Sequence, residues 1–238
     1  MQLNQPVSPF YDALTDQWDD MKRYGANARH TYRHIFTLLR GLSYQTVLDV
    51  SCGGAFLLQQ IRNRNADTLL AGTEFSTHAI ELCKARIPDA DFYNLNLEQS
   101  ALPRQFDLVL CIDVLEHIQD DMAAIQNLHK MTGKYLLIAV PLGRIFKTER
   151  ENLGHIHAYS RSEIRLKLHT SHFRITREIC WGFPFYDLSR RIAVLLKRNP
   201  AEGRYSLRKR GVFNLLYGVY FLNIFPFGER YFALCEPE

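Results

Sequence analysis

Short apolar runs alternate along the chain with longer stretches whose apolar residues recur every three or four positions. The runs are bounded by glycine, proline or polar residues, which is typical of buried parallel strands. They lie at 46–50, 68–73, 108–112 and 135–140, and a further short strand is predicted at 91–94. The intervening stretches predict helices at 54–63, 77–86 and 120–131. Strands that alternate with helices in this way predict an α/β protein built on a mostly parallel sheet.

The pattern changes at both ends of the chain. Residues 9–40 predict two helices ahead of the sheet, each with an apolar stripe. After 141, Ser160 and Glu163 form a capping box for a helix that runs through His169. A strand at 173–180, an aromatic turn at 181–186, a helix at 188–198 and a last strand at 231–235 complete the prediction.

The first apolar run leads directly into a loop of small residues, in the segment TVLDVSCGGAFLLQ. Small residues such as Ser51 and Gly53 let a backbone approach a ligand, and the free N–H groups of a helix start then face that ligand. A pyrophosphate or an adenosyl-sulfonium would suit such a loop. Asp49, at the end of the strand, would repel a diphosphate but can accept hydrogen bonds from loop amides or an ammonium group. The dinucleotide fingerprint G-x-G-x-x-G is absent, which disfavours a nicotinamide cofactor.

A second acidic residue ends the second predicted strand. Glu74 lies 21 positions after Gly53. An acid about 20 residues past the loop, at the carboxyl end of a strand, can accept hydrogen bonds from both hydroxyls of a ribose. The same placement serves NAD and S-adenosylmethionine, and it also fits a plain loop acid. Phe75 follows and can pack on an adenine ring.

Two motifs together resemble a known family. The segment VLDVSCG is similar to the first motif of the class I S-adenosylmethionine-dependent methyltransferases, although Ser51 and Ala55 replace two of its glycines. The segment FDLVLCIDVLEHI is similar to the fourth motif of the small-molecule branch of that family. The resemblance covers roughly 45–185 and the final strand. It implies an α/β, doubly wound, seven-stranded and mostly parallel Rossmann-like sheet, with the last strand antiparallel beside the fifth.

The resemblance also implies a domain organisation. We expect a single domain with an N-terminal helical lid at 1–43 and a cofactor-binding core at 44–180. A helical substrate cap at 181–229 is inserted before the last strand at 230–238.

The cofactor implied by the resemblance is S-adenosylmethionine, with S-adenosylhomocysteine as the product. Strands one and four flank the point where strand order reverses, which is where ligands bind in such sheets. The residues expected to contact the cofactor come from the loop, the strand ends and the lid: Asp49, Ser51, Gly53, Glu74, Phe75, Asn96, Leu97, Ile112, Asp113, His117, Tyr11 and Arg29. Packing in the core is the other interpretation for Tyr11, and exposure to solvent is the other for Arg29.

Methyl transfer from a sulfonium requires alignment of the two reactants and, for some acceptors, a base. His117, His155 and His157 are the candidates, since imidazole titrates near neutral pH. A structural role is the other interpretation of each histidine, and it is favoured until the geometry is known. The pair His155 and His157 lacks a third ligand at a regular spacing, so no metal site is predicted.

Composition limits the cellular setting. The chain has 238 residues, of which 47% are hydrophobic, enough for one large domain. Its five cysteines are scattered without a C-x-x-C pair, which indicates reduced thiols and a cytoplasmic protein. The first residues lack the pattern of a secretory signal.

Charge is unevenly distributed. Residues 1–142 carry 12 Lys and Arg against 16 Asp and Glu, whereas 143–238 carry 17 against 9. A basic second part favours an anionic small molecule, a nucleic acid or an anionic membrane, or is simply a solvated face. Nucleic acid is disfavoured because the segment IDVLEH stands where nucleic-acid branches of the resembling family often carry an N/D-P-P-Y-type motif.

A basic cluster at 204–210 precedes 18 residues without charge, 211–228. This run has the minimum length of a membrane span, but Asn214, Gly218, Asn223 and Pro226 interrupt it. A helix lying on a membrane surface is a second interpretation. A buried helix that caps the substrate or forms a homodimer is the third.

The function predicted from these features is methyl transfer from S-adenosylmethionine to a small or lipid-like acceptor. Oxygen as the accepting atom follows from the family tendency. Two alternatives remain open: a non-catalytic scaffold of the same fold that binds a nucleoside or a membrane, and an NAD-dependent oxidoreductase.

Overall fold

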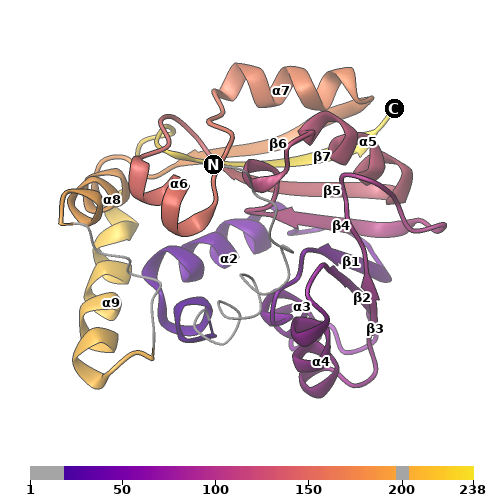
Figure 1. Cartoon of the computed structure of the whole chain (residues 1–238), viewed down its shortest axis with the longest axis horizontal. Coiled ribbons are helices and arrows are strands. Elements are labelled where there is room, and N and C mark those ends of the chain that lie inside the picture. The colour runs from indigo at the N-terminus through magenta and orange to yellow at the C-terminus, as the bar shows by residue number, and fades with distance from the viewer. Residues whose placement is uncertain (1–18, 197–203) are drawn as a thin grey trace.

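A computed structural model describes residues 19–196 and 204–238. Its centre is a seven-stranded sheet in the order β3-β2-β1-β4-β5-β7-β6 (Figure 1). The strands are β1 (Thr46–Val50), β2 (Leu69–Glu74), β3 (Asp91–Asn94), β4 (Phe106–Ile112), β5 (Thr132–Pro141), β6 (Phe173–Trp181) and β7 (Arg230–Pro237). Only β7 runs antiparallel to its neighbours, β5 and β6. The predicted doubly wound, mostly parallel sheet is confirmed.

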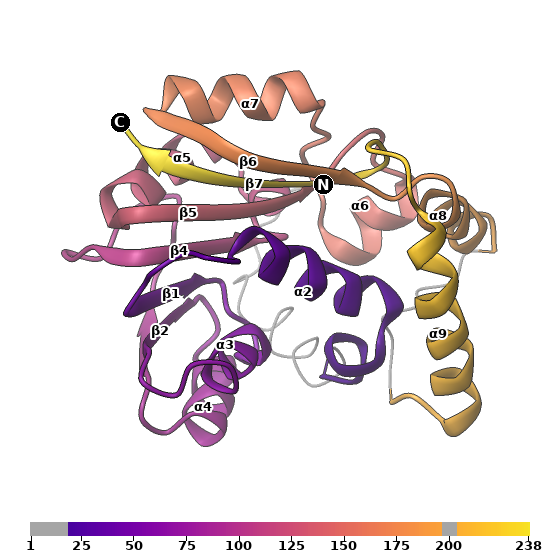
Figure 2. The same cartoon turned by 180° about the vertical axis from the view of Figure 1, so that it is seen from behind.

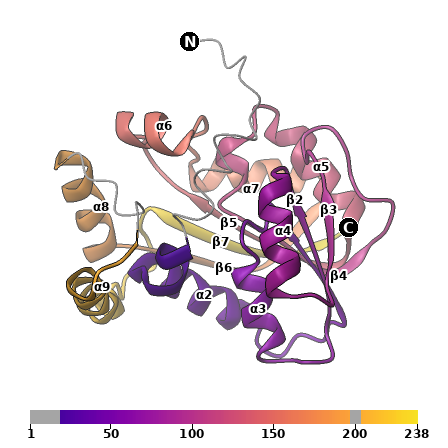
Figure 3. The same ribbon diagram turned by 60° about the horizontal axis from the view of Figure 1, so that its bottom comes forward.

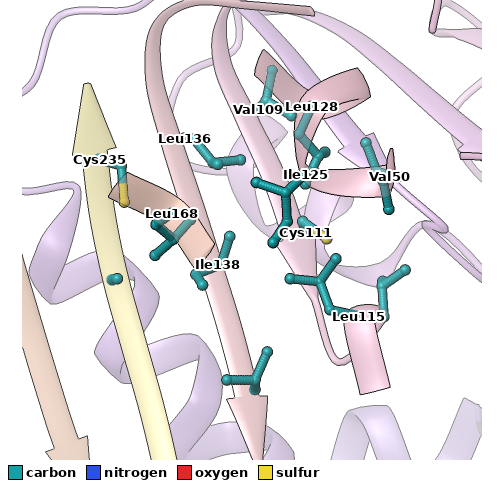
Figure 4. Packing of buried hydrophobic residues seen from close by; sticks show 14 of the residues in the cluster. Val50, Val109, Cys111, Leu115, Ile125, Leu128, Leu136, Ile138, Leu168 and Cys235 are labelled. Atoms are coloured by element: carbon teal, nitrogen blue, oxygen red, sulfur yellow. The ribbon is translucent and has the colours of Figure 1, made fainter. Parts of the chain in front are cut away.

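Helices cover both faces of the sheet. The helices α2 (Ala26–Leu38), α3 (Phe56–Arg62) and α4 (Thr77–Arg86) pack on one face, and α5 (Asp121–Met131) and α7 (Arg161–Thr170) pack on the other. Because side chains alternate along a strand, Val47 points to the first layer and Leu48 to the second. Figure 4 shows the second layer, where Ile125 and Leu128 of α5 meet Val109 of β4.

The helix α2, which falls in the segment expected to form the lid, belongs to the first layer. Ile35 and Leu38 are buried, and they pack in the same cluster as Val47 and Phe232 of the sheet. The apolar stripe predicted in this segment therefore faces the sheet and not a ligand. Tyr11, the lid residue expected at the cofactor, lies outside the described residues.

The segment between β6 and β7 forms an extension beside α2 (Figures 1, 2 and 3). It contains α8 (Phe185–Leu195), α9 (Leu207–Val219) and the short 3-10 helix η2 (Tyr220–Leu222). The helix α8 begins three residues earlier than predicted, and its first turn holds Asp187, where a carboxylate favours the helix start. A short helix that was not predicted, α6 (Lys147–Leu153), follows β5.

The uncharged run 211–228 is not a buried helix. No residue of α9 is buried. Among the described residues, no helix combines the length and the apolar character that crossing a membrane requires. The membrane span is therefore wrong for the part of the chain that is described. The helix α9 is not buried within a single chain, and its role as a substrate cap or a homodimer contact stays a prediction.

Candidate functional site

The loop after β1 adopts a left-handed backbone at two residues that are not glycine. Ser51 has φ 54° and Ala55 has φ 57°, conformations that cost an L-residue roughly 1–2 kcal/mol. The neighbouring strand and helix hold the loop in this shape. The Cys52 N–H donates to the Thr73 carbonyl at 2.9 Å, and the Arg86 guanidinium donates to the Gly54 carbonyl. The turn thus forms without the two missing glycines.

Asp49 is buried at the end of β1, beside this loop. Its side chain is only 4% exposed, and burial raises its pKa to about 7. The positive charge of Lys22 lowers this pKa and the negative charge of Glu74 raises it. A carboxyl group with so little solvation favours a cation as its partner.

The cavity that remains beside Asp49 is small. Its volume is about 40 Å³, and Lys22, Tyr32 and Ile112 contribute to its lining. Sites for nucleoside-sized ligands occupy roughly 300–1,000 Å³. A ligand of that size therefore requires the cavity to open. Lys22, on the helical residues 19–24, is the lining residue nearest the start of the described chain.

Glu74 ends β2 and is tied to the loop and to its own strand end. Its Oε2 accepts a hydrogen bond from the Gly53 N–H at 2.8 Å, and its Oε1 accepts one from the Phe75 N–H at 2.8 Å. Oε1 also accepts a longer hydrogen bond from the Ser76 N–H, at 3.4 Å. Oε2 keeps a second lone pair that can accept from a ribose hydroxyl. Phe75 is exposed next to it, at the edge where an adenine would lie.

Asn96 and Leu97 follow β3, as predicted, but the Asn96 side-chain oxygen and the Leu97 carbonyl already have hydrogen-bond partners. The Asn96 amide oxygen accepts from the Glu98 N–H at 3.0 Å. The Leu97 carbonyl accepts from the Asn127 side chain at 2.8 Å, and the Leu97 side chain is buried. The predicted contact of Asn96 with an adenine amino group would have to replace or share that hydrogen bond.

Arg29 does not point toward this site. Its guanidinium lies 3.5 Å from the centre of the Tyr217 ring and donates to the Asn214 side chain at 2.9 Å. Both partners belong to α9. The expected contact of Arg29 with a cofactor is therefore wrong in this structure, because the residue joins α2 to the extension.

Asp113 follows β4 in a left-handed conformation, with φ 57°. Its Oδ1 accepts a hydrogen bond from Arg230 at 2.5 Å, and Arg230 is only 3% exposed. Burial would raise the pKa of Asp113, but the charge and hydrogen bond of Arg230 outweigh it and hold the pKa below its usual value. Sequence reasoning missed Arg230. The signal was an arginine at the head of an otherwise apolar strand.

The three candidate histidines separate into a pair and an outlier. The rings of His117 and His155 lie 4.8 Å apart, edge to face. His157 turns away, with its Nε2 2.7 Å from the Ile118 carbonyl and its ring stacked on Tyr159. His157 is therefore committed to structural contacts, contrary to its prediction as a base.

Glu116 completes a cluster with the histidine pair. One ligand atom from each of Glu116, His117 and His155 lies within 4.8 Å of the other two. Burial raises the pKa of Glu116 to about 8 and lowers that of His117 to about 4. The sequence analysis did not identify Glu116 as a member of this cluster. Glu116 and His117 are adjacent in the chain, but His155 lies far from both, and no regular spacing links the three residues.

A larger hollow, of about 470 Å³, lies on the loop 99–105 before β4. Ligands of open α/β sheets bind outside the carboxyl ends of the strands. This hollow lies at the amino end of β4, whereas the loop, Asp49, Glu74, Asp113 and the histidine pair follow the carboxyl ends of β1, β2 and β4. The candidate site is therefore at the opposite end of the sheet from the hollow.

Comparison with known sequences matches the part of the chain that forms this site. Residues 48–134 match the profile of a family described as "Methyltransferase domain". A ubiquinone biosynthesis O-methyltransferase from Nitrosomonas europaea is 32% identical over 100 residues, which are 40% of this chain and 42% of that protein. A protein of the same description from Pseudomonas paraeruginosa is 31% identical over 97 residues, 38% of this chain and 41% of its own length. The chain thus matches about two fifths of the length of these curated relatives.

Solved structures of similar architecture extend over nearly the whole chain. The magnesium protoporphyrin IX methyltransferase from Synechocystis PCC 6803 with bound SAH has a TM-score of 0.62 at 16% identity, and the match covers 98% of each chain. The N-methyltransferase NodS from Bradyrhizobium japonicum has a TM-score of 0.61 at 14% identity, with 96% and 98% covered. A [4+2]-cyclase, SpnF, has a TM-score of 0.66 at 14% identity, with 97% and 94% covered. At such identities the likeness establishes the fold, which is shared by proteins of different printed activities.

Proposed function

The chain carries a class I S-adenosylmethionine-dependent methyltransferase domain, and we propose that it transfers the methyl group of S-adenosylmethionine to a small or lipid-like acceptor. S-adenosylhomocysteine is the product that leaves. We propose oxygen as the accepting atom, and the O-methyltransferase names of the curated relatives support this choice.

One observation carries the proposal: two carboxyl groups flank the loop 51–55 at the ends of neighbouring strands. Asp49 is buried on β1, where the ammonium group of S-adenosylmethionine would favour the ionised form of its carboxyl group. Glu74 on β2 presents its Oε2 beside Gly53, where a ribose would lie. The loop between them has the small side chains and the tight turn that an adenosyl-sulfonium requires.

The reaction needs few groups from the protein. A lone pair of the acceptor oxygen attacks the methyl carbon, and the carbon–sulfur bond breaks with its electron pair remaining on sulfur. The sulfonium becomes a neutral thioether, and the acceptor hydroxyl loses its proton. The protein contributes mainly by aligning the oxygen with the methyl group. His117 and His155, both with a pKa lowered by burial, are neutral at pH 7 and offer lone pairs near the end of β4.

The proposed roles follow a division of the chain. We propose that 44–180 and the last strand form the cofactor-binding part, and that 181–229 shape the acceptor side.

Calorimetric titration with S-adenosylhomocysteine tests the cofactor, with NAD as the comparison ligand. We expect micromolar binding of S-adenosylhomocysteine alone. The variant Glu74→Gln should bind it roughly 10- to 150-fold more weakly, since a hydrogen bond to a charged group contributes about 1.5–3 kcal/mol. Glu81→Gln, on the exposed side of α4, is the matched control and should bind as the wild type does. Binding of NAD, or equal affinities in all three proteins, would contradict the proposal.

Methylation of a panel of phenols and hydroxylated lipids is then measured with labelled S-adenosylmethionine. Tight binding without transfer to any acceptor would favour the scaffold interpretation.

We further propose that the extension contacts an anionic lipid surface. Exposed large apolar side chains are concentrated there, at Leu188, Ile192, Leu195, Leu196, Leu207, Val212, Leu215, Phe221, Leu222, Ile224, Phe225 and Phe227. The basic cluster 204–210 stands at the start of α9, which complements lipid phosphates. A lipid-like acceptor would reach the site from such a surface.

Flotation with vesicles distinguishes a membrane from a second copy of the chain. We expect the protein to float with vesicles that contain phosphatidylglycerol and to float less with pure phosphatidylcholine. Leu215→Ser should weaken flotation, whereas Leu166→Ser on α7 should not, although the two leucines are 70% and 66% exposed. Absence of flotation, together with a dimer that Leu215→Ser dissociates in light scattering, would assign the surface to a homodimer.

A further inference from the structure

Three buried polar atoms at the carboxyl end of β4 have no hydrogen-bond partner within the described part of the chain. They are Glu116 Oε2, His117 Nδ1 and His155 Nδ1. A buried polar group without a partner destabilises the folded protein, so three in one place require an explanation. The same three residues form the cluster whose ligand atoms lie within 4.8 Å of one another.

The backbone holds this cluster in position. Glu116 and His117 lie on the 3-10 helix η1 (Leu115–His117). The Glu116 carbonyl accepts hydrogen bonds from the N–H groups of Ile156 and His157, at 2.8 and 3.2 Å. These two bonds fix the loop that carries His155 against η1. The convergence of the three side chains therefore rests on main-chain contacts and not on the orientation of one long side chain.

The donor set is that of a transition-metal site. Two imidazoles and one carboxylate bind Zn²⁺, Co²⁺ and Fe²⁺ in proteins, and they leave coordination positions open for a substrate. Ligand atoms about 2.0–2.2 Å from one Zn²⁺ ion lie roughly 3.3 Å from each other, so small side-chain rotations suffice to close the cluster. Asp113 is not counted, because its carboxylate is paired with Arg230.

We propose that Glu116, His117 and His155 bind a divalent first-row transition-metal ion beside the cofactor loop. The cluster follows β4, and β4 is the sheet neighbour of β1, which leads into that loop. This places the ion on the acceptor side of the site. The two histidines then serve as ligands and not as bases.

The role of the ion in the reaction rests on the proposed function. A hydroxyl bound to the ion loses its proton to water more readily, since a bound cation stabilises the negative oxygen. The oxygen lone pair then attacks the methyl carbon, the carbon–sulfur bond breaks toward sulfur, and neutral S-adenosylhomocysteine forms. An acceptor with two neighbouring hydroxyls, such as a catechol, suits an ion that offers two open positions.

Metal titration of protein without a histidine tag tests the site, with Co²⁺ followed by its visible absorption and Zn²⁺ by calorimetry. We expect one ion per chain. His155→Gln and Glu116→Gln should each weaken binding at least 100-fold. His157→Gln is the matched control, because it removes an imidazole from the same loop outside the cluster, and it should leave metal affinity unchanged. Thermal melting of each variant without metal checks that it is folded, and His155→Gln, on a loop, is the substitution that the fold tolerates best.

The outcomes separate this inference from the proposed function, because S-adenosylhomocysteine is titrated into the same samples. Binding of S-adenosylhomocysteine without binding of Co²⁺ or Zn²⁺ would overturn the metal site and leave the proposed function standing. Metal binding that His155→Gln leaves intact would also overturn it. Metal binding that is weakened by both His155→Gln and Glu116→Gln, in a protein that does not bind S-adenosylhomocysteine, would support the site and contradict the function.

Discussion

Replacing Asp49 with asparagine should stabilise the free protein at neutral pH and impair cofactor binding. Asp49 is 4% exposed, and its pKa is raised to about 7 by burial. The side chain is therefore costly to ionise in the folded state, while an unfolded chain ionises it near the ordinary value of 3.8. Asparagine has nearly the same shape and carries no charge at any pH.

The magnitude follows from the difference between the two pKa values. Below pH 4 both states hold the proton, and the carboxyl group costs nothing. Between pH 4 and 7 the unfolded chain releases the proton and the folded protein keeps it, so stability falls by about 1.4 kcal/mol for each pH unit. Above pH 7 the cost stays constant, on the order of 4 kcal/mol. This is a large share of the roughly 5–15 kcal/mol that stabilises a typical domain.

Urea unfolding of both proteins at pH 5 and pH 8 measures this effect. Other titrating groups are common to the two proteins, so the difference between them isolates Asp49. We expect the advantage of Asp49→Asn to be about 3 kcal/mol larger at pH 8 than at pH 5. Affinity for S-adenosylhomocysteine should fall more than tenfold, since the asparagine lacks the charge that pairs with an ammonium group.

Asp107→Asn supplies a control of opposite sign. Partial burial would raise the pKa of Asp107, but hydrogen bonds from the Gln45 N–H and from Lys134 outweigh it and lower the pKa. Its contribution to stability is present above the unfolded pKa and is lost as the pH falls, so this variant should be less stable than the wild type at pH 8. An advantage of Asp49→Asn that does not change between pH 5 and pH 8 would refute the account of Asp49.

Three further substitutions test other contacts. Ser51→Gly should stabilise the protein by about 0.5–1 kcal/mol in urea unfolding, because glycine adopts the left-handed conformation of this position without strain, while Ser100→Gly should not stabilise it. Arg190→Met should lower the free energy of unfolding by about 3 kcal/mol, because Arg190 pairs with both Glu149 and Glu229 at 2.6 Å in a poorly exposed site. Arg191→Met, at an exposed residue, should lower it by less than about 1 kcal/mol. Arg29→Ala should lower stability by about 1 kcal/mol through loss of its contact with Tyr217 and leave S-adenosylhomocysteine affinity unchanged, and a tenfold loss of affinity would restore Arg29 to the cofactor site.

The sheet was predictable because its strands are local features of the sequence. The strands predicted at 46–50 and 91–94 coincide with β1 and β3. Polar residues in the immediate neighbourhood, such as Gln45 and Ser51 around β1, mark their boundaries. The placement of Asp49 and Glu74 at the carboxyl ends of neighbouring strands follows from the same local pattern. These residues were therefore found before any contact was known.

The features that the sequence did not predict depend on contacts between distant parts of the chain. Arg230 meets Asp113 across 117 positions, and no periodicity connects them. The His155 ring lies beside the His117 ring because N–H groups of its loop donate to the Glu116 carbonyl. The ring of His157, two residues away, is not part of this pair. Arg29 has the same charge whether it faces a cofactor or Tyr217. Sequence patterns fix the direction of a side chain relative to its own helix or strand, but not the identity of its partner.

The position of β7 has a consequence for the order in which the protein matures during translation. The strand β7 lies between β5 and β6, although both are synthesised before it. A nascent chain that has reached residue 229 thus has β6 without a neighbour in the sheet and Asp113 without its arginine. Insertion of β7 joins β6 to the rest of the sheet and brings Arg230 to Asp113 in the same step. The ion pair between Asp113 and Arg230 therefore cannot form before β7 has entered the sheet.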